Sequence, residues 1–151
     1  MLDSVNPKNI NLKRYLGKWN EIASFPAWFQ RGCLEVTAEY SKREDNKIGV
    51  KNTCKDRRGT KRVAKGTAVP TQKANILQLQ FFPLIKADYI IEFLVNAPQG
   101  QKYPYVVVGS TGKKYLWILS RTKRVPKEIF DELVSIAEKK GYDVSRLEVR
   151  K

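Results

Sequence analysis

The 151-residue chain is long enough to bury one sizeable core. Its apolar fraction of 42% excludes a disordered chain, and it holds no run of 18 apolar residues that would span a membrane as a helix. It has no histidine, the commonest general base and metal ligand, and two cysteines alone cannot complete a zinc site. We therefore expect neither a metal nor a cofactor. The net charge of +14 fits a polyanionic partner or plain solubility.

The first 14 residues form an N-terminal segment ahead of the predicted strands. This segment lacks the basic start and apolar stretch of a secretory signal. If the protein is exported, we expect its targeting segment to lie outside this chain.

From residue 15 to 122 the sequence predicts a β-barrel. Short runs with turn signals between them indicate strands at residues 19–25, 34–42, 47–55, 61–69, 76–82, 88–95, 103–109 and 115–121. Within one run Leu77, Leu79 and Phe81 alternate with Gln78 and Gln80, so one face of the predicted strand is apolar and the other is polar and faces solvent. The turns are too short for parallel crossovers, and eight antiparallel strands can close into an up-and-down barrel.

Residues 126–140 predict an amphipathic helix. Ile129, Leu133, Ile136 and Ala137 fall on one stripe, which we expect to pack on the outside of the barrel. Pro126 suits the first helical position, and Gly141 suits the end. A final short strand is expected at 145–150, and the whole chain, 1–151, is expected to form a single domain.

Three motifs resemble those of one protein family. Gly17-Lys18-Trp19 opens the first strand and resembles the G-x-W motif of lipocalins. The run from Tyr115 to Thr122 resembles the last-strand motif of that family, which ends in an arginine, here Arg121. Residues 141–145 are similar to bacterial outer-membrane and apolipoprotein-D-like lipocalins. The family's Thr-Asp-Tyr-like middle motif has no clean counterpart, which leaves the turn between the sixth and seventh strands undetermined.

The resemblance implies an all-β fold, an eight-stranded antiparallel up-and-down barrel with a C-terminal helix packed outside. It assigns Gly17, Trp19 and Arg121 to the closed end, where the indole plugs the floor and the guanidinium stacks across it. A flat cation over an indole is favourable by about 0.5–2 kcal/mol. We expect this role to be structural and not catalytic.

The resemblance also implies a protein that binds and transports or stores a small hydrophobic ligand, here a fatty acid or lysophospholipid, and that is not an enzyme. Strand alternation predicts an inward set that includes Ala23, Gly66, Ala68 and Val106. The predicted ligand-binding residues are Phe25, Trp28, Phe29, Ala38, Tyr40, Val50, Asn52, Leu77, Leu79, Phe81, Tyr89, Ile91, Phe93, Val108, Trp117 and Leu119. The alternative, that these residues only pack a core, stays open.

Positive charge is concentrated in the segments expected at the open end. These segments hold nine basic residues and one acid, Asp56. We expect the rim to bind an anionic head group, with Trp28 and Phe29 as an apolar lip or a contact with an anionic membrane; a merely solvated rim is the alternative. The rim cations that we single out are Arg31, Lys55, Arg57, Arg58, Lys86, Lys113 and Lys114.

Cys33 and Cys54 lie near cross-strand register on one predicted hairpin. A disulfide between them would indicate an oxidising compartment such as the periplasm, and two free buried thiols are the alternative. Glu21 shares the inward face of Trp19, so its carboxylate needs hydrogen-bond partners or a raised pKa.

Two other functional classes compete with a carrier. A nucleic-acid-binding barrel fits the charge, but most aromatic residues are expected inside, and no known nucleic-acid-binding motif occurs. An enzyme would have only Cys33, Cys54 and Glu21 as candidate groups, without a recognisable constellation. We expect a monomer or weak homodimer, without a specific nucleic-acid partner, in the periplasm or at a bacterial outer membrane if the protein is exported.

Overall fold

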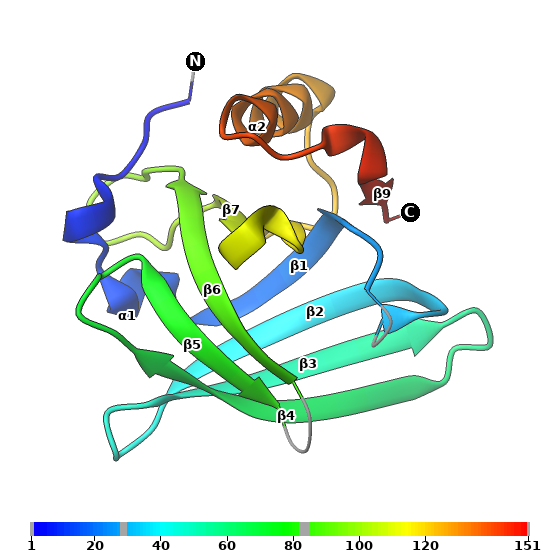
Figure 1. The fold of residues 1–151 in the computed structure, drawn as a ribbon, viewed down its shortest axis with the longest axis horizontal. Coiled ribbons are helices and arrows are strands. Elements are labelled where there is room, and N and C mark those ends of the chain that lie inside the picture. Colours follow the sequence, from blue (N-terminus) through cyan, green and yellow to red (C-terminus); the bar gives the residue numbers. More distant parts are fainter. Residues whose placement is uncertain (1, 28–29, 82–84, 151) are drawn as a thin grey trace.

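The computed structural model describes residues 2–27, 30–81 and 85–150, without the side chains of residues 81, 85 and 86. Figure 1 shows a barrel of curved strands with α2 lying outside it. The strands are β1 (Gly17–Ser24), β2 (Cys33–Lys42), β3 (Ile48–Asp56), β4 (Lys61–Pro70), β5 (Ile76–Phe81), β6 (Ile85–Leu94), β7 (Tyr105–Gly109), β8 (Leu116–Ser120) and β9 (Glu148–Val149). The α-helices are α1 (Leu12–Tyr15) and α2 (Lys127–Lys139), and short 3₁₀ turns cover Pro7–Asn9, Thr111–Lys113 and Val144–Arg146.

Antiparallel pairing of each strand with the next closes the predicted eight-stranded barrel. β1 pairs with β8 on one edge and with β2 on the other, so the sheet returns on itself. The β1–β2 ladder covers only Gly17 to Asn20 of β1. Beyond it, Ala23 and Ser24 pair with β9, which takes the place of β2 along this edge.

Most element boundaries differ from the predicted ones by one to three residues, and three of these differences are informative. β6 begins at Ile85 and not at residue 88, because the ladder with β5 continues to the Phe81–Ile85 pair. Pro126 caps α2 from an extended conformation (ψ 141°) and is not its first helical residue. The strand expected at 145–150 is reduced to Glu148–Val149 by the 3₁₀ turn before it.

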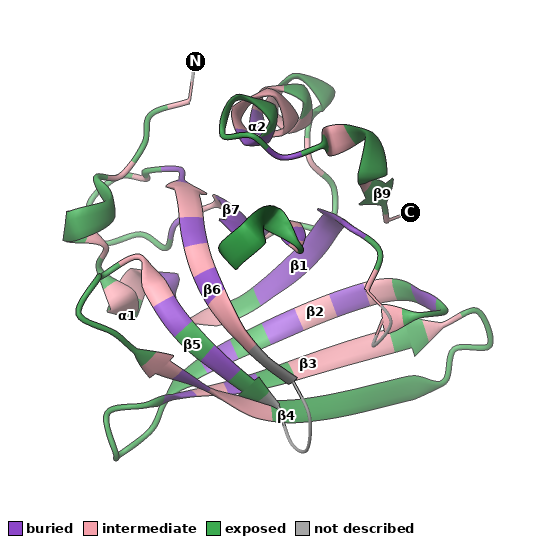
Figure 2. Cartoon of the chain, in the orientation of Figure 1, coloured by how far each residue is buried: buried purple, intermediate pink, exposed green. Residues whose placement is uncertain are grey.

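Two apolar clusters lie on opposite faces of the barrel wall. Figure 2 shows the corresponding pattern, in which buried residues alternate with exposed ones along several strands. The inner cluster is formed by Tyr15, Trp19, Ala38, Tyr40, Ile48, Val50, Ala68, Leu77, Leu79, Tyr89, Ile91, Leu94, Tyr103, Val106, Val108 and Leu119. The outer cluster joins the wall to α2 and contains Ile22, Ala23, Phe25, Val95, Val107, Leu116, Ile118, Leu133, Ala137 and Tyr142. The helix thus covers the second apolar face, as its stripe predicts.

The inward prediction is wrong for Ala23, Phe25 and Phe93. All three pack in or against the outer cluster. The ladder between β1 and β8 shifts register between Glu21 and Ala23, and the ladder between β6 and β7 shifts between Ile91 and Phe93. One extra residue in a strand sends the following side chains to the opposite face.

Arg121 and Trp19 seal the closed end, as the family resemblance predicts. The guanidinium carbon of Arg121 lies 3.8 Å from the centre of the Trp19 ring. Its nitrogens donate hydrogen bonds to the carbonyls of Lys18 (2.8 Å), Tyr103 (3.0 Å) and three residues around α1, Arg14, Tyr15 and Leu16 (2.9–3.1 Å). Burial lowers the pKa of Arg121 to about 10, so it stays charged at neutral pH.

Arg14 holds the turn that the sequence left undetermined. Its guanidinium donates to the carbonyls of Gln101 (2.6 Å) and Ala97 (2.9 Å) in the connection between β6 and β7. It also lies 4.4 Å from the centre of the Tyr103 ring. The N-terminal segment therefore fastens this connection to the floor of the barrel.

Candidate ligand-binding cavity

A cavity of about 50 Å³ lies inside the barrel. Its lining is contributed by β1, β2, β3, β5, β6 and β8 and by the connections that follow β1 and precede β8. The described lining residues are Glu21, Gln30, Val36, Ala38, Tyr40, Val50, Asn52, Leu79, Ala87, Tyr89, Tyr115, Trp117 and Leu119. Most are apolar, as in small-molecule sites generally.

Aromatic side chains fill the barrel below this cavity. The Tyr15 and Tyr89 hydroxyls are hydrogen-bonded to each other, and the Tyr40 ring lies 5.8 Å from both rings, centre to centre. Tyr15 also packs on Trp19 at 5.3 Å. Burial raises the pKa of Tyr40 to about 12 and that of the other two tyrosines well above the usual value, so all three stay neutral. The open space is therefore confined to the part of the barrel nearer the rim.

The structure brings together half of the sixteen predicted ligand-binding residues. Ala38, Tyr40, Val50, Asn52, Leu79, Tyr89, Trp117 and Leu119 line the cavity. Leu77, Ile91 and Val108 belong to the inner cluster without lining the cavity, and Phe25 and Phe93 lie outside the wall. Trp28 and Phe29 and the side chain of Phe81 lie outside the described residues. Contact of any of these residues with a ligand stays a prediction.

Sequence reasoning missed four lining residues. Val36 shares the period-2 pattern of Ala38 and Tyr40, and this pattern could have identified it. Ala87 directly precedes the strand predicted at 88–95, and Tyr115 is the first residue of the strand predicted at 115–121, although β8 begins at Leu116. Gln30 lies in the connection between β1 and β2, where no periodicity indicates which side chains point inward.

Glu21 is the acidic residue of the lining, and the predicted inward orientation is correct. It is 5% exposed, and its Oε2 atom accepts a hydrogen bond from Gln30 Nε2 at 3.3 Å. Arg150 Nε lies 3.5 Å from the same oxygen. Burial raises the pKa of Glu21 to about 7, because the loss of hydration outweighs the attraction of Arg150.

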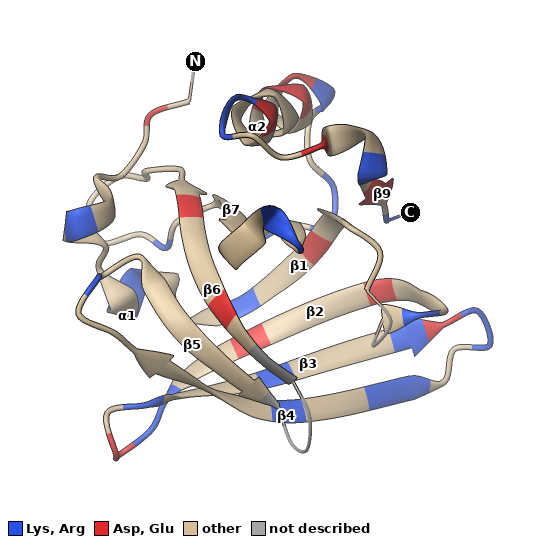
Figure 3. Cartoon of the chain, in the orientation of Figure 1, with Lys and Arg blue, Asp and Glu red and all other residues tan. Residues whose placement is uncertain are grey.

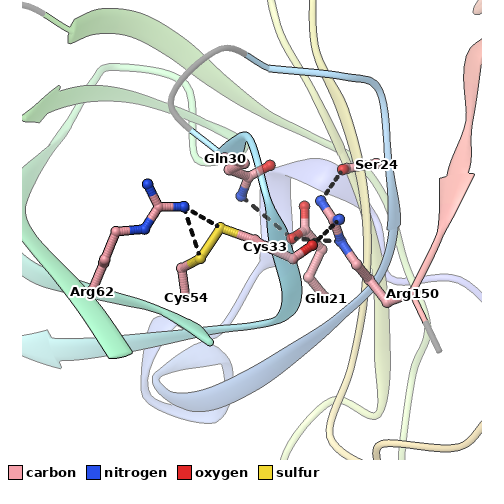
Figure 4. Close-up of polar contacts among 7 residues, drawn as sticks. All are labelled: Glu21, Ser24, Gln30, Cys33, Cys54, Arg62 and Arg150. Atoms are coloured by element: carbon pink, nitrogen blue, oxygen red, sulfur yellow. Dashed lines mark hydrogen bonds and ion pairs between the residues drawn. A yellow bond between two sulfur atoms is a disulfide. The ribbon is translucent and has the colours of Figure 1, made fainter. Parts of the chain in front are cut away.

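Arg150 closes the seam where β1 and β2 separate (Figure 4). Its guanidinium donates to the carbonyl of Cys33 on β2 at 2.9 Å and to Ser24 Oγ on β1 at 3.1 Å. Its backbone N–H donates to the carbonyl of Ile22 at 2.8 Å. The C-terminal segment thus holds the carboxylate of Glu21 from the side opposite the cavity.

Cys33 and Cys54 form the predicted disulfide between β2 and β3. Arg62 on β4 covers it, with Nη2 lying 3.3 Å from each sulfur and 2.7 Å from the carbonyl of Arg31 (Figure 4). Two of the three groups considered for an enzyme are therefore occupied in a covalent bond. In the described part of the chain, no group of three acidic or cysteine side chains is placed to hold a metal.

The rim cations gather on one side of the barrel. The hairpin between β3 and β4 holds Lys55, Arg57, Arg58, Lys61 and Arg62, all exposed, and appears as a blue patch in Figure 3. β4 pairs with β5 only from Gly66 onward, so the first half of β4 projects past its neighbour.

The remaining rim cations are more dispersed. Arg31, on the connection after β1, is exposed and lies beside Arg62. Lys113 and Lys114 lie over the rings of Tyr142 and Tyr115, each 5.4 Å from the ring centre. The side chain of Lys86 lies outside the described residues.

Comparison with known proteins agrees with this architecture. The Lipocalin-like domain family matches residues 10–151. The outer membrane lipoprotein Blc of Vibrio cholerae is 34% identical over 97% of this chain and 86% of its own length, and mouse apolipoprotein D is 30% identical over 93% and 76%. Lobster apocrustacyanin A1 superposes with a TM-score of 0.72 at 17% identity, over 92% of this chain and 78% of its own.

None of the helices in the described ranges is long and apolar enough to cross a membrane. The chain belongs to the lipocalin family, whose members bind small hydrophobic ligands.

Proposed function

We propose that this protein carries or stores an amphiphile with one slender apolar chain, which enters the barrel from the rim. The observation that supports this most strongly is the cavity itself, an apolar space above a floor sealed by Trp19 and Arg121. The closed floor leaves the rim as the way in for such a chain, and the cavity marks where its entry begins.

The small volume of the cavity restricts the class of ligand that we propose. A volume of about 50 Å³ is below the 300–1,000 Å³ typical of drug-sized ligands. A single acyl chain needs the least width, and each buried methylene contributes roughly 0.8 kcal/mol before association costs. We therefore propose a fatty acid or lysophospholipid and not a sterol or pigment, with Trp117 and Leu79 shifting to admit the chain.

The basic hairpin supports an anionic head group on this ligand. Five exposed cations between β3 and β4, with Arg31 beside them, create a positive potential at one side of the rim. Such a field raises the association rate and favours carboxylate or phosphate, while burial of the tail sets most of the affinity. The same surface would favour peripheral contact with an anionic membrane.

A carrier role at a bacterial outer membrane or in the periplasm is proposed from two observations. The disulfide between Cys33 and Cys54 suits an oxidising compartment. Related chains from Vibrio cholerae and Escherichia coli are named outer membrane lipoproteins. Lipocalins are generally carriers, and we propose that this chain is one and not an enzyme.

The test compares a fatty acid with its methyl ester at low and high salt. The acid should bind more tightly at low salt, and added salt should reduce this advantage because exposed charges are screened within about 8 Å at physiological ionic strength. The Arg57→Gln/Arg58→Gln variant should reduce the advantage in the same way. Equal affinity of acid and ester at all salt concentrations would contradict the role of the rim, and absence of binding by both would contradict the carrier.

A further inference from the structure

Three buried oxygen atoms around the cavity have no hydrogen-bond partner among the described residues. They are Glu21 Oε1, Gln30 Oε1 and Asn52 Oδ1. All three side chains line the same cavity. A buried acceptor without a donor loses its hydration without compensation, which makes three of them around one space unfavourable unless something in that space donates to them.

No described group donates a hydrogen bond to these three oxygens. The neighbouring lining is apolar and includes Ala38, Val50, Leu79 and Leu119. The hydroxyls of Tyr15 and Tyr89 are already engaged with each other at the floor. The three acceptors therefore form a polar spot in an otherwise apolar cavity.

The carboxylate of Glu21 is held in one orientation by Gln30, which lines the cavity, and by Arg150, which lies outside it. Its Oε2 atom accepts from Gln30 and faces Arg150, and Arg150 is itself fixed by the Cys33 carbonyl and Ser24 Oγ (Figure 4). Because these contacts use only one of the two carboxylate oxygens, Oε1 is left for the cavity. A side chain oriented in this way is preorganised to accept a hydrogen bond.

We propose that Glu21, Gln30 and Asn52 form a subsite for a hydrogen-bond donor, and that it binds the free hydroxyl group of an acyl lipid such as a lysophospholipid. This inference rests on the proposed function and deepens it, because it specifies which group next to the chain is recognised. A hydroxyl can donate to these acceptors, whereas an ether oxygen or an ionised carboxylate cannot. Sites that hydrogen-bond a hydroxyl reject analogues that lack it.

A matched pair of ligands tests the subsite. Dodecanol and dodecyl methyl ether share one apolar chain and differ in the donor, and each is titrated as a competitor of the neutral apolar fluorophore N-phenyl-1-naphthylamine. The alcohol should displace the fluorophore at a concentration roughly ten-fold lower than the ether. 1-Monolauroylglycerol should share the advantage of the alcohol.

Two variants locate the effect. At pH 8, above the pKa of about 7 for Glu21, the advantage of the alcohol should fall to within about two-fold in the Glu21→Gln/Asn52→Leu protein, since one acceptor is lost and another loses its charge. The ether should bind nearly as before, which also reports that the variant is folded. Glu39→Gln, an exposed acid on β2, is the matched control and should keep the full advantage.

The outcomes separate this inference from the carrier proposal. If alcohol and ether compete equally in the wild-type protein, the donor subsite is wrong although an apolar ligand binds; trapped water that already satisfies the three oxygens would give this result. If the double variant keeps the full advantage, the donor is recognised elsewhere and the assignment is wrong. If neither ligand nor the fluorophore binds, the carrier proposal itself fails.

Discussion

The hydroxyl group of Tyr142 occupies the space that a side chain on Gly109 would need. A Cβ atom built on Gly109 would lie 1.8 Å from Tyr142 Oη and 2.5 Å from its Cζ atom. Tyr142 follows α2, packs against Phe25 at 6.2 Å between ring centres, and donates a hydrogen bond to Glu92 at 2.5 Å. This contact fastens the end of the helix to the outside of β6 and β7.

Gly109→Ala should therefore destabilise the protein by about 2 kcal/mol, because the added methyl must displace a buried ring. Denaturant unfolding monitored by tryptophan fluorescence measures this loss. In a Tyr142→Ala background the same substitution should cost much less, since the obstructing ring is gone. Equal costs in both backgrounds would show that the contact with Tyr142 is not the cause.

Replacing Arg121 with lysine should destabilise the fold by roughly 2–4 kcal/mol. Lysine keeps the charge, but it cannot stack flat on Trp19 or donate to five carbonyls at once. The measurement is the free energy of unfolding, with Arg124→Lys, an exposed arginine, as the control. A loss no larger than that of the control would refute the sealing role of Arg121.

The disulfide should contribute about 3 kcal/mol to stability. Cys33 and Cys54 are 21 residues apart, and closing a loop of this length removes entropy from the unfolded chain. Urea unfolding of the Cys33→Ala/Cys54→Ala variant against the oxidised wild type measures the contribution. Wild-type protein treated with reductant should match the variant, and its denatured form should expose two thiols that the oxidised protein lacks.

Glu21 should make the protein less stable as the pH rises from about 4.5 to 7. Burial raises its pKa from 4.5 to about 7, so over this range the folded state holds a proton that the unfolded state has released. Stability therefore falls as the pH rises, by about 3 kcal/mol in total for a shift of this size. The hydroxyl of Tyr40, whose pKa burial raises to about 12, stays neutral throughout this range.

Comparing Glu21→Gln with the wild type isolates this contribution. In the variant, the free energy of unfolding should not show this decrease with rising pH. The difference in unfolding free energy between the two proteins should therefore change by about 3 kcal/mol between pH 4.5 and pH 8. Glu39→Gln, at an exposed position on β2, serves as the matched control. Parallel profiles for the wild type and Glu21→Gln would contradict the raised pKa.

Strand alternation predicted the lining where the ladders are regular. Ala38 and Tyr40 on β2 and Val50 on β3 face inward as expected, because these two strands stay in register along this part of the ladder. The same rule failed for Phe25 and Phe93, since bulges shift the register before each of them and hydrophobic patterning does not reveal a bulge.

The polar side of the cavity could be predicted only in part. Glu21 follows from alternation with Trp19, but Gln30 comes from a connection without periodicity. Arg150 reaches Glu21, 129 positions away, because β9 replaces β2 beside β1, and no local pattern indicates this pairing. The closed end was predictable because Trp19 and Arg121 each sit in a recognisable family motif.

Filling the cavity tests the central claim most directly. Ala38 lines the hollow part of the barrel, and Ala38→Phe should occupy the space that the ligand would take. Titration with N-phenyl-1-naphthylamine should show saturable binding to the wild-type protein and at least ten-fold weaker binding to the variant, with both proteins folded by circular dichroism. Equal binding by the two proteins, or none by the wild type, would contradict a ligand cavity inside this barrel.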